Sequence, residues 1–456
     1  MHFIPLHILF LFGGNLFLWG WWIRIDWTVG EPPVIRTLMM IFFGILVVYM
    51  FGRMHFLPLR LNPEADARIS IMIAGRFLAY RGMYYFFLEI FFLLFSYSFF
   101  RRLGVSQSIL ISNIIFGIIS PLFTIFNGAC RMFFTSRRLS ILRRVVILLT
   151  MWVPVVNWIV LGYTGHIVHM EYDFALYKKA LENTRVESDM CRTKYPFIFV
   201  HGVLFRDLKY FNYWGRIPKI LKKHGAQIYY GHQEAAGGYP ANAEKISAMI
   251  RKVCAETGCE KVNIIAHSKG GLDARYAISC KGMEAYVASL TMLNVPNRGS
   301  YVMDILCKLP EGIYRFLAKI FNWIFHKMGD ENPDFYVATR ELTTDACARF
   351  NQQVPDSPQV YYQSYMSVMK NLISDSLLFF PYLMIRSAAP ANDRKNDGLI
   401  TISSAWWGKQ KALFSTKSRR GISHGDMIDL KREDFKGFDV QEMYMTMVSD
   451  LKKMGF

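Results

Sequence analysis

The sequence predicts an α-helical membrane region followed by an α/β domain with a mostly parallel central sheet. The chain of 456 residues is long enough for about two or three domains. Its apolar residues, 52% of the total, are concentrated before residue 165, which indicates helices in a membrane rather than a large soluble core. From Tyr195 onward, short apolar strands alternate with helices, as in parallel sheets covered on both faces. We therefore divide the chain into a membrane region (1–164), a helical connector (165–190) and an α/β domain (191–456).

The membrane region contains five apolar segments that are candidates for transmembrane helices. They are Phe3 to Trp22, Leu38 to Phe51, Met83 to Phe100, Ile109 to Phe126 and Val145 to Tyr163. The first lacks the basic start and the small-residue cleavage site of a signal peptide, so we expect it to remain in the protein. The second is shorter and crosses a bilayer only if its flanking arginines, Arg36 and Arg53, extend to the head groups.

Arginines between these segments predict the orientation of the chain. The loops after the second and fourth segments are richer in arginine than the loops after the first and third. Because basic loops stay in the cytoplasm, five crossings put the N-terminus inside the cell and the α/β domain outside the cytoplasm, as a multi-pass protein of the cell membrane. The prediction fails if the second segment does not cross. Glu89, inside the third segment, is either a functional carboxylate or a structural partner of a neighbouring helix.

The formal net charge of +18 does not indicate nucleic acid as a partner. Many basic residues lie in short loops between apolar segments, where anionic lipid head groups are the expected partner, and no nucleic-acid-binding motif accompanies them. The spacing of the seven cysteines matches no zinc pattern. Six of them follow the membrane region and could form disulfides outside the cytoplasm or remain buried thiols. The oligomeric state stays open.

The α/β domain begins with four predicted strands. The strands are Tyr195–Val200, Ala226–Tyr230, Val262–Ala266 and Tyr286–Val295, and the predicted helices are Phe211–Lys223, Ala241–Glu256 and Ala274–Ser279. Their alternation predicts a parallel sheet, and in such sheets the functional site forms at the carboxyl ends of the strands. His201-Gly202 and Ser268 both fall at such ends.

The segment from Val262 to Gly271 reads as a strand, a sharp turn and the start of a helix, with Ser268 at the tip of the turn. A serine nucleophile requires this arrangement, because its hydroxyl must stand clear of the sheet while backbone N–H groups point to the same place. Ala266 and Gly270 flank Ser268 and must nearly touch across the turn, so both must be small. The alternative is an ordinary strand-to-helix turn that contains a serine.

Five motifs, in this order, resemble the bacterial true lipases of the Pseudomonas and Burkholderia type: KYPFIFVHGV, KVNIIAHSKGGLDARY, LNVPNRGS, ARFN and NDGLI. Those proteins are triacylglycerol lipases with an α/β-hydrolase fold and a helical lid. The resemblance runs from about Tyr195 to the C-terminus and does not cover the membrane region. It implies Ser268 as nucleophile, Asp397 as the acid and His424 as the base, which is the chain order of α/β hydrolases.

The resemblance implies hydrolysis of a carboxylic ester through an acyl-enzyme, with His424 transferring the proton. Backbone N–H groups of Val203 and Lys269 would form the oxyanion hole. The family usually has glutamine at the position of Lys269, so this cation could favour anionic substrates or simply extend to solvent. His267 adjoins Ser268, and we expect its side chain to point away from the turn.

An insertion at about 301–347 occupies the position of the family's lid. Its helix Ile313–His326 has one narrow polar stripe and is otherwise apolar. That pattern suits a lid that opens onto lipid or a helix packed over a large core. The resemblance also implies a structural calcium ion held by two aspartates, to which Asp426 corresponds and for which Asp375 is a candidate. We expect no other cofactor.

Together these features predict a membrane-anchored serine hydrolase that cleaves carboxylic esters of lipids. The resemblance implies triacylglycerol as substrate, whereas the membrane region suggests phospholipid or lysophospholipid. Acyl transfer to another alcohol would use the same residues. A protein of another class, which binds or senses lipid without catalysis, is also compatible with the sequence.

Overall fold

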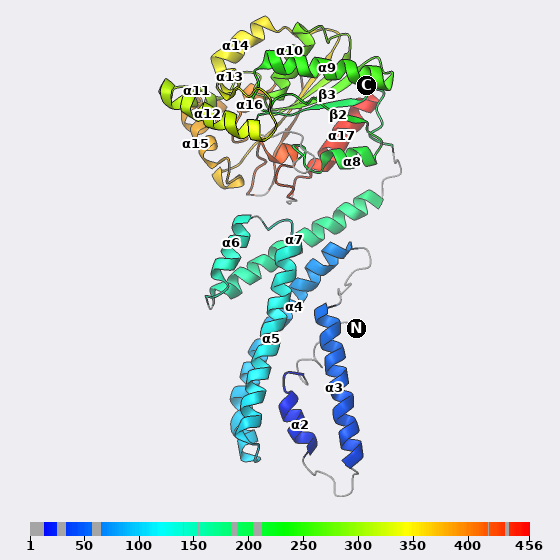
Figure 1. Ribbon diagram of the computed structural model, residues 1–456, viewed down its shortest axis with the longest axis vertical. Coiled ribbons are helices and arrows are strands. Elements are labelled where there is room, and N and C mark those ends of the chain that lie inside the picture. The colour runs from blue at the N-terminus through cyan, green and yellow to red at the C-terminus, as the bar shows by residue number, and fades with distance from the viewer. Residues whose placement is uncertain are drawn as a thin grey trace. The chain divides into compact units, whose positions relative to one another are not determined.

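The protein, seen here in a computed structural model, forms two compact units, Met1–Thr184 and Arg185–Phe456 (Figure 1). The structure describes residues 13–24, 33–56, 65–139, 141–153, 155–183, 189–203, 212–417, 419–433 and 437–456.

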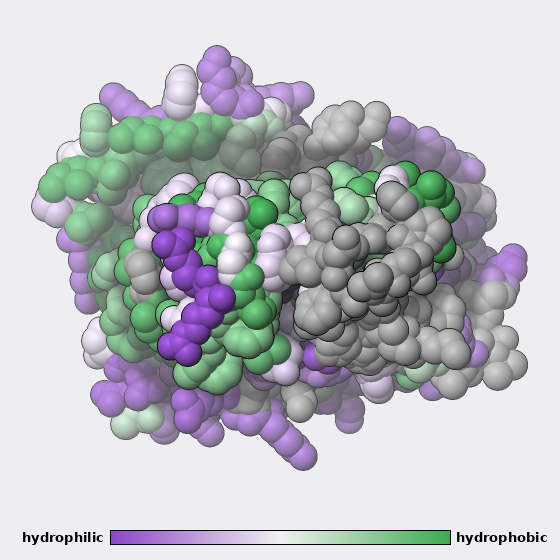
Figure 2. All heavy atoms as spheres, turned by 90° about the horizontal axis from the view of Figure 1, so that it is seen from below, coloured by the Kyte–Doolittle hydropathy of each residue, from purple (hydrophilic) through white to green (hydrophobic). Residues whose placement is uncertain are grey.

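The described part of the first unit is helical. Its helices are α2 (Leu16–Arg24), α3 (Pro33–Phe56), α4 (Ala67–Arg102), α5 (Gln107–Thr135), α6 (Ile141–Thr150) and α7 (Val156–Asn183). Three of them, α3, α4 and α5, are long and apolar enough to cross a membrane, and they contain the second, third and fourth predicted segments. Large apolar side chains on these helices are exposed, among them Phe42 at 63% and Leu94 at 73%. Figure 2 shows hydrophobic side chains over much of the face in view. A bilayer would cover such a surface favourably.

Helices α4 and α5 pack closely because glycines let their backbones approach. A Cβ atom on Gly128 would lie 2.5 Å from the backbone nitrogen of Ala79, a distance that no side chain permits. Further along these helices, Glu89 accepts a hydrogen bond from Asn15 Nδ2 at 3.3 Å, and Asn15 accepts one from Asn113 Nδ2 at 2.9 Å. Glu89 therefore has the structural pairing that the sequence left open.

The fifth predicted segment, Val145 to Tyr163, is not a single helix. Helix α6 ends at Thr150 and α7 begins at Val156. Between them Val155 has a φ of +67°, which a right-handed helix cannot contain. The first segment, Phe3 to Trp22, lies partly outside the described residues. The fifth crossing as one continuous helix is therefore wrong, and the orientation deduced from five crossings stays a prediction.

The second unit contains a six-stranded parallel sheet. Its strands are β1 (Phe197–Val200), β2 (Ile228–Tyr230), β3 (Val262–His267), β4 (Val287–Leu293), β5 (Tyr361–Ser367) and β6 (Lys409–Phe414), in the spatial order β2-β1-β3-β4-β5-β6. Every pairing between neighbouring strands is parallel, so the predicted fold class is confirmed. The sequence does not predict β5 and β6, because polar residues interrupt their apolar runs.

Helices cover both faces of this sheet (Figure 1). Alternate residues of β1 explain the two layers, since successive side chains of a strand point to opposite faces. Ile198 and Val200 pack with α9 (Tyr239–Thr257) and α10 (Gly270–Cys280). Phe197 and Phe199 pack with α8 (Ile217–Lys223) and α17 (Val440–Lys453). Because β1 pairs with β3 and β3 pairs with β4, the carboxyl ends of these three strands lie side by side.

The remaining helices lie between β4 and β6 in the sequence. They are α11 (Tyr301–Leu306), α12 (Glu311–Lys327), α13 (Phe335–Arg340), α14 (Thr344–Gln353), α15 (Phe379–Ala388) and α16 (Ile402–Ala405), with short turns η2 (Leu372–Ser374), η3 (Ala391–Asp393) and η4 after β6 (Asp426–Ile428). The connector predicted at 165–190 is helical as far as Asn183, where α7 ends. Within the described residues no disulfide joins the cysteines.

Helix α12, in the predicted lid, has one packed apolar side and one exposed apolar side. Tyr314, Ala318 and Phe325 are buried. Phe316 and Trp323 are each 63% exposed. The wide apolar face that the sequence predicts is therefore not explained by packing over a core alone.

Candidate active site

Ser268 lies in the turn between β3 and α10. Its φ of +55° is in the left-handed region, which is uncommon for a residue with a side chain and typical of functional positions. Its N–H donates to the carbonyl oxygen of Leu293 at 3.1 Å, which ties the turn to the end of β4. Helix α10 begins two residues later, at Gly270. A strained serine between a strand and a helix N-terminus is the geometry of an α/β-hydrolase nucleophile.

Backbone contacts leave little space around Ser268. A Cβ atom on Gly270 would lie 2.3 Å from the carbonyl oxygen of His201. Gly270 is therefore required by the end of β1, and its expected contact with Ala266 stays a prediction. A Cβ atom on Gly202 would lie 2.7 Å from Ser268 Cβ. Gly202, just after the end of β1, thus lies directly against the serine.

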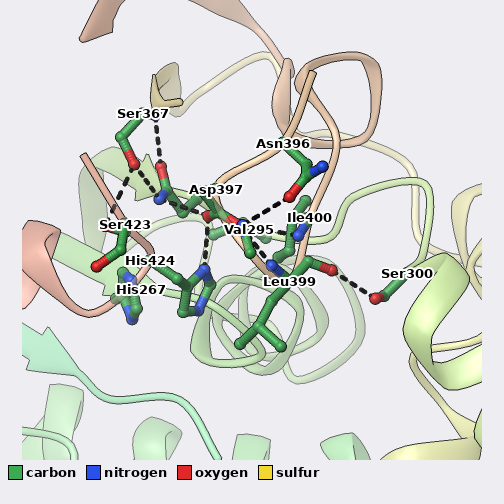
Figure 3. A network of polar contacts seen from close by, with 12 residues as sticks. His267, Val295, Ser300, Ser367, Asn396, Asp397, Leu399, Ile400, Ser423 and His424 are labelled. Carbon is green, nitrogen blue, oxygen red and sulfur yellow. Dashed lines mark hydrogen bonds and ion pairs between the residues drawn. The ribbon is translucent and has the colours of Figure 1, made fainter. Parts of the chain in front are cut away.

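Asp397 and His424 form a hydrogen-bonded pair in the same domain (Figure 3). Asp397 Oδ2 lies 2.7 Å from His424 Nδ1, and the carbonyl oxygen of Asp397 accepts the His424 N–H at 2.9 Å. The other carboxylate oxygen of Asp397 accepts the N–H groups of Leu399 and Ile400 at 2.9 and 2.8 Å. These donors compensate for the full burial of Asp397. With Nδ1 bound to a carboxylate, Nε2 of His424 is left to take up a proton.

Asn294 holds Asp397 from the end of β4. Its Nδ2 donates to Asp397 Oδ2 at 2.6 Å and to Ser367 Oγ at 2.8 Å, while its Oδ1 accepts the Ser367 N–H at 3.1 Å. Sequence reasoning misses this residue. Asn294 could have been found from its position, because it follows a strand at the carboxyl edge of the sheet and lies in the LNVPNRGS motif.

His267 lies beside His424, with ring centroids 4.4 Å apart (Figure 3). The expectation that it points away is therefore wrong. Its Nδ1 is 2.7 Å from the hydroxyl of Tyr213. Burial, and then the charge of His424, hold the pKa of His267 well below its usual value. A neutral His267 can pack against His424 without repelling a positive charge on its ring.

The two backbone donors expected for an oxyanion hole, Val203 and Lys269, are both unengaged. Among the residues that the structure describes, neither backbone N–H donates a hydrogen bond to the backbone. The Val203 loop is fixed by Gln233, whose Nε2 donates to the carbonyl oxygen of His201 at 2.8 Å. Fixed N–H groups next to a nucleophile can stabilise a developing negative charge.

Comparison with known proteins relates part of this chain to lipases. Residues 194–293 match the model of the family described as Lipase (class 2). The chain is 33% identical over 179 residues to triacylglycerol lipases of Pseudarthrobacter phenanthrenivorans and Burkholderia plantarii, matches that cover 36% of this chain and 55% and 49% of those proteins. It is 27% identical over 276 residues to triacylglycerol lipase 2 of Saccharomyces cerevisiae, covering 55% of this chain and 78% of that protein.

The C-terminal unit is thus similar to lipases over residues 194–293, and its parallel sheet covered by helices on both faces is that of an α/β hydrolase. The family match runs from just before β1 to the end of β4, so it contains the loop after β1 and the serine turn. It does not extend into the first unit. The chain spans about half the length of the first two relatives. We refer to the second unit as the lipase-like domain.

The Lys269 side chain of the lipase-like domain is buried, contrary to both expectations for it. Its side chain is 2% exposed, and Nζ lies 2.5 Å from Asp273 Oδ1 and 3.5 Å from Glu341 Oε2. Asp273 also accepts from Asn242 Nδ2 at 2.9 Å, and Glu341 accepts the N–H of Tyr239 at 2.8 Å. Burial raises the pKa of Glu341 to about 7, although the charge of Lys269 opposes it. Two carboxyl groups therefore surround this cation, and its buried side chain does not extend to solvent or to a substrate surface.

Asp375 and Asp426, the aspartates assigned to calcium, lie together in the lipase-like domain, but each is paired with a cation. Lys431 Nζ lies 2.6 Å from Asp375 Oδ1, and Arg420 Nη2 lies 2.7 Å from Asp426 Oδ1. Ser423 donates to the remaining oxygen of each carboxylate. A calcium ion takes about six to eight oxygen ligands. Across the described ranges no group of three or more His, Cys, Asp or Glu side chains could hold a metal ion. The residues present do not fit calcium.

Proposed function

We propose that the lipase-like domain hydrolyses carboxylic esters of lipids, with Ser268 as nucleophile. The observation that carries this proposal is the left-handed backbone of Ser268, with a φ of +55°, against the Gly202 loop. The hydrogen bond of 2.7 Å between Asp397 and His424 supplies an acid–base partner of the right kind. The relatives named triacylglycerol lipase support the same interpretation.

In the proposed reaction, His424 Nε2 accepts the proton of Ser268 as the hydroxyl oxygen attacks the ester carbonyl. Asp397 keeps the imidazole oriented and stabilises its positive charge. The N–H groups of Val203 and Lys269 stabilise the oxyanion. His424 then returns the proton to the leaving alcohol, and a water molecule releases the acid from the acyl-enzyme by the same steps.

Lipid esters are the proposed substrate class because the protein exposes apolar surface in both units. On helix α12 the exposed residues include Ile313, Phe316 and Trp323. Helices α3, α4 and α5 suit a bilayer in length and composition. We propose that they anchor the domain at a membrane, where tethering raises the local concentration of a lipid substrate. Triacylglycerol follows from the relatives' names, and membrane phospholipid, cleaved or used as acyl donor, follows from the anchor.

The test uses the full chain purified in detergent. Ester hydrolysis is measured on tributyrin, a long-chain triacylglycerol and a phospholipid, with the wild type and with Ser268→Ala. We expect turnover by the wild type on at least one substrate and its loss in the variant. Lipid binding without any Ser268-dependent turnover would instead identify a protein that binds or senses lipid.

A further inference from the structure

Two ion pairs flank the segment that carries His424. Arg420 precedes this histidine and Lys431 follows it, and they bind Asp426 and Asp375 at 2.7 and 2.6 Å. Both carboxylates are buried, with side chains 5% and 3% exposed. A buried carboxylate must be paired, so these cations are what permits the two aspartates to lie side by side.

Every oxygen of the two carboxylates has a donor from the protein. Asp375 Oδ1 accepts from Lys431 and Asp426 Oδ1 from Arg420. Asp375 Oδ2 accepts from Ser423 Oγ at 2.7 Å, and Asp426 Oδ2 accepts from the Ser423 N–H at 2.8 Å. A divalent ion would have to displace these donors and lie beside two fixed positive charges, both of which oppose its binding.

This cluster lies one residue from the candidate base. Ser423, which bridges the two aspartates, directly precedes His424. Arg420 also donates from Nε to the carbonyl oxygen of Ser374 at 3.0 Å. Asp375 and Ser374 belong to the connection between β5 and α15, so both sides of the His424 segment are tied to the same connection. Any shift of that connection would move His424 relative to Ser268.

We propose that Arg420 and Lys431 take the place of the structural calcium ion that the sequence resemblance implies. They neutralise Asp426 and Asp375 and hold His424 in position, so the enzyme works without calcium. We call Arg420, Lys431, Asp375, Asp426 and Ser423 the cation brace. Arg420 and Lys431 are positioning residues, because they touch no reacting atom. The role in activity rests on the proposed ester hydrolysis, whereas the role in stability does not.

The experiment measures unfolding temperature, kcat and KM on a soluble short-chain ester, using the full chain in detergent with EGTA or with millimolar calcium. We expect neither addition to change the wild type. Lys431→Met should lose roughly tenfold to hundredfold in kcat, because misplacement of a catalytic group by about 1 Å has an effect of that size. Its KM should stay the same, because the substrate surface is untouched. Lys431→Arg should restore most of the kcat.

A second variant makes the cluster respond to metal. Lys431→Asp would bring a third carboxylate to Asp375 and Asp426, so calcium should raise the unfolding temperature of this variant and not that of the wild type. The matched control is Lys409→Met, which removes an exposed lysine at the start of β6 and should change nothing.

Three results would overturn the proposal: a rise in the wild-type unfolding temperature with calcium, a loss of wild-type activity with EGTA, or an unchanged kcat and unfolding temperature for Lys431→Met. If the wild type hydrolyses no ester, the proposed function fails. The unfolding temperatures of the wild type, Lys431→Met and Lys431→Asp then still decide whether the cation brace replaces calcium.

Discussion

Replacing Lys269 by methionine should destabilise the lipase-like domain strongly, although the residue lies at a helix N-terminus. Methionine keeps most of the aliphatic stem and removes the charge. Asp273, with its side chain 2% exposed, then loses its cation, and so does Glu341 at 13%. Breaking a buried ion pair from one side removes about 3–5 kcal/mol of stability. Because Glu341, with a pKa of about 7, can take up a proton, and Asn242 still donates to Asp273, we expect the lower end, about 3 kcal/mol. For a domain of this size that corresponds to a fall of about 6–12 °C in unfolding temperature.

The assay is thermal unfolding of the full chain in detergent, followed by near-ultraviolet circular dichroism. The control is Lys252→Met, which removes an exposed ion pair of 3.8 Å with Glu256 on the surface of α9. Exposed pairs of this kind contribute at most about 1 kcal/mol, so the control should change the unfolding temperature little. A loss in Lys269→Met no larger than in the control would refute the reasoning.

A second substitution separates the buried charge from the lost packing. Adding Asp273→Asn to Lys269→Met removes the unpaired carboxylate, so the double variant should recover part of the lost unfolding temperature. Lys269→Gln carries the residue that is usual in the family the sequence resembles, and it should lie between the wild type and Lys269→Met. If the double variant is less stable than Lys269→Met alone, the unpaired charge is not the cause.

Three further predictions concern catalysis, lipid contact and pH. Asp397→Asn should lower kcat on a soluble ester by about 10⁴-fold, because an amide no longer fixes the tautomer of His424. An unchanged kcat would contradict the proposed triad. Trp323→Gln should weaken hydrolysis on lipid vesicles by roughly tenfold or more, because about 2 kcal/mol of apolar burial is lost. Turnover of a soluble ester should stay the same. Equal losses on both substrates would argue against lipid contact by α12. For Glu341, burial raises the folded pKa from 4.5 to about 7, so the folded state retains a proton that the unfolded state has lost. The contribution of Glu341 therefore makes wild-type stability fall as the pH rises from 4.5 to about 7. Over the same range the unfolding temperature of Glu341→Gln should rise relative to that of the wild type. A difference that does not vary with pH would contradict that assignment.

Most of the parallel sheet could be predicted because its first four strands are continuous apolar runs, such as Phe197–Val200, separated by helices with an apolar face. Strands β5 and β6 could not, because residues such as Gln363 and Lys409 interrupt the pattern. The break between α6 and α7 in the first unit could not be predicted from the sequence either. The apolar segment Val145 to Tyr163 is long enough for one crossing, and only the backbone turn at Val155 divides it.

The sequence by itself determined which residues could carry the chemistry and in what order. The serine between a strand and a helix and the short motifs around Asp397 and His424 are local patterns. Local patterns can be recognised in the linear sequence. The tertiary structure decided where the charges lie. Lys269 lies next to Glu341 because the chain brings the end of α13 back to the serine turn. Likewise, the two aspartates expected to bind calcium are matched by Arg420 and Lys431. The pairs Lys269–Glu341 and Lys431–Asp375 depend on contacts between distant segments, so no spacing within one segment reveals them. Asp273, by contrast, lies one helical turn from Lys269.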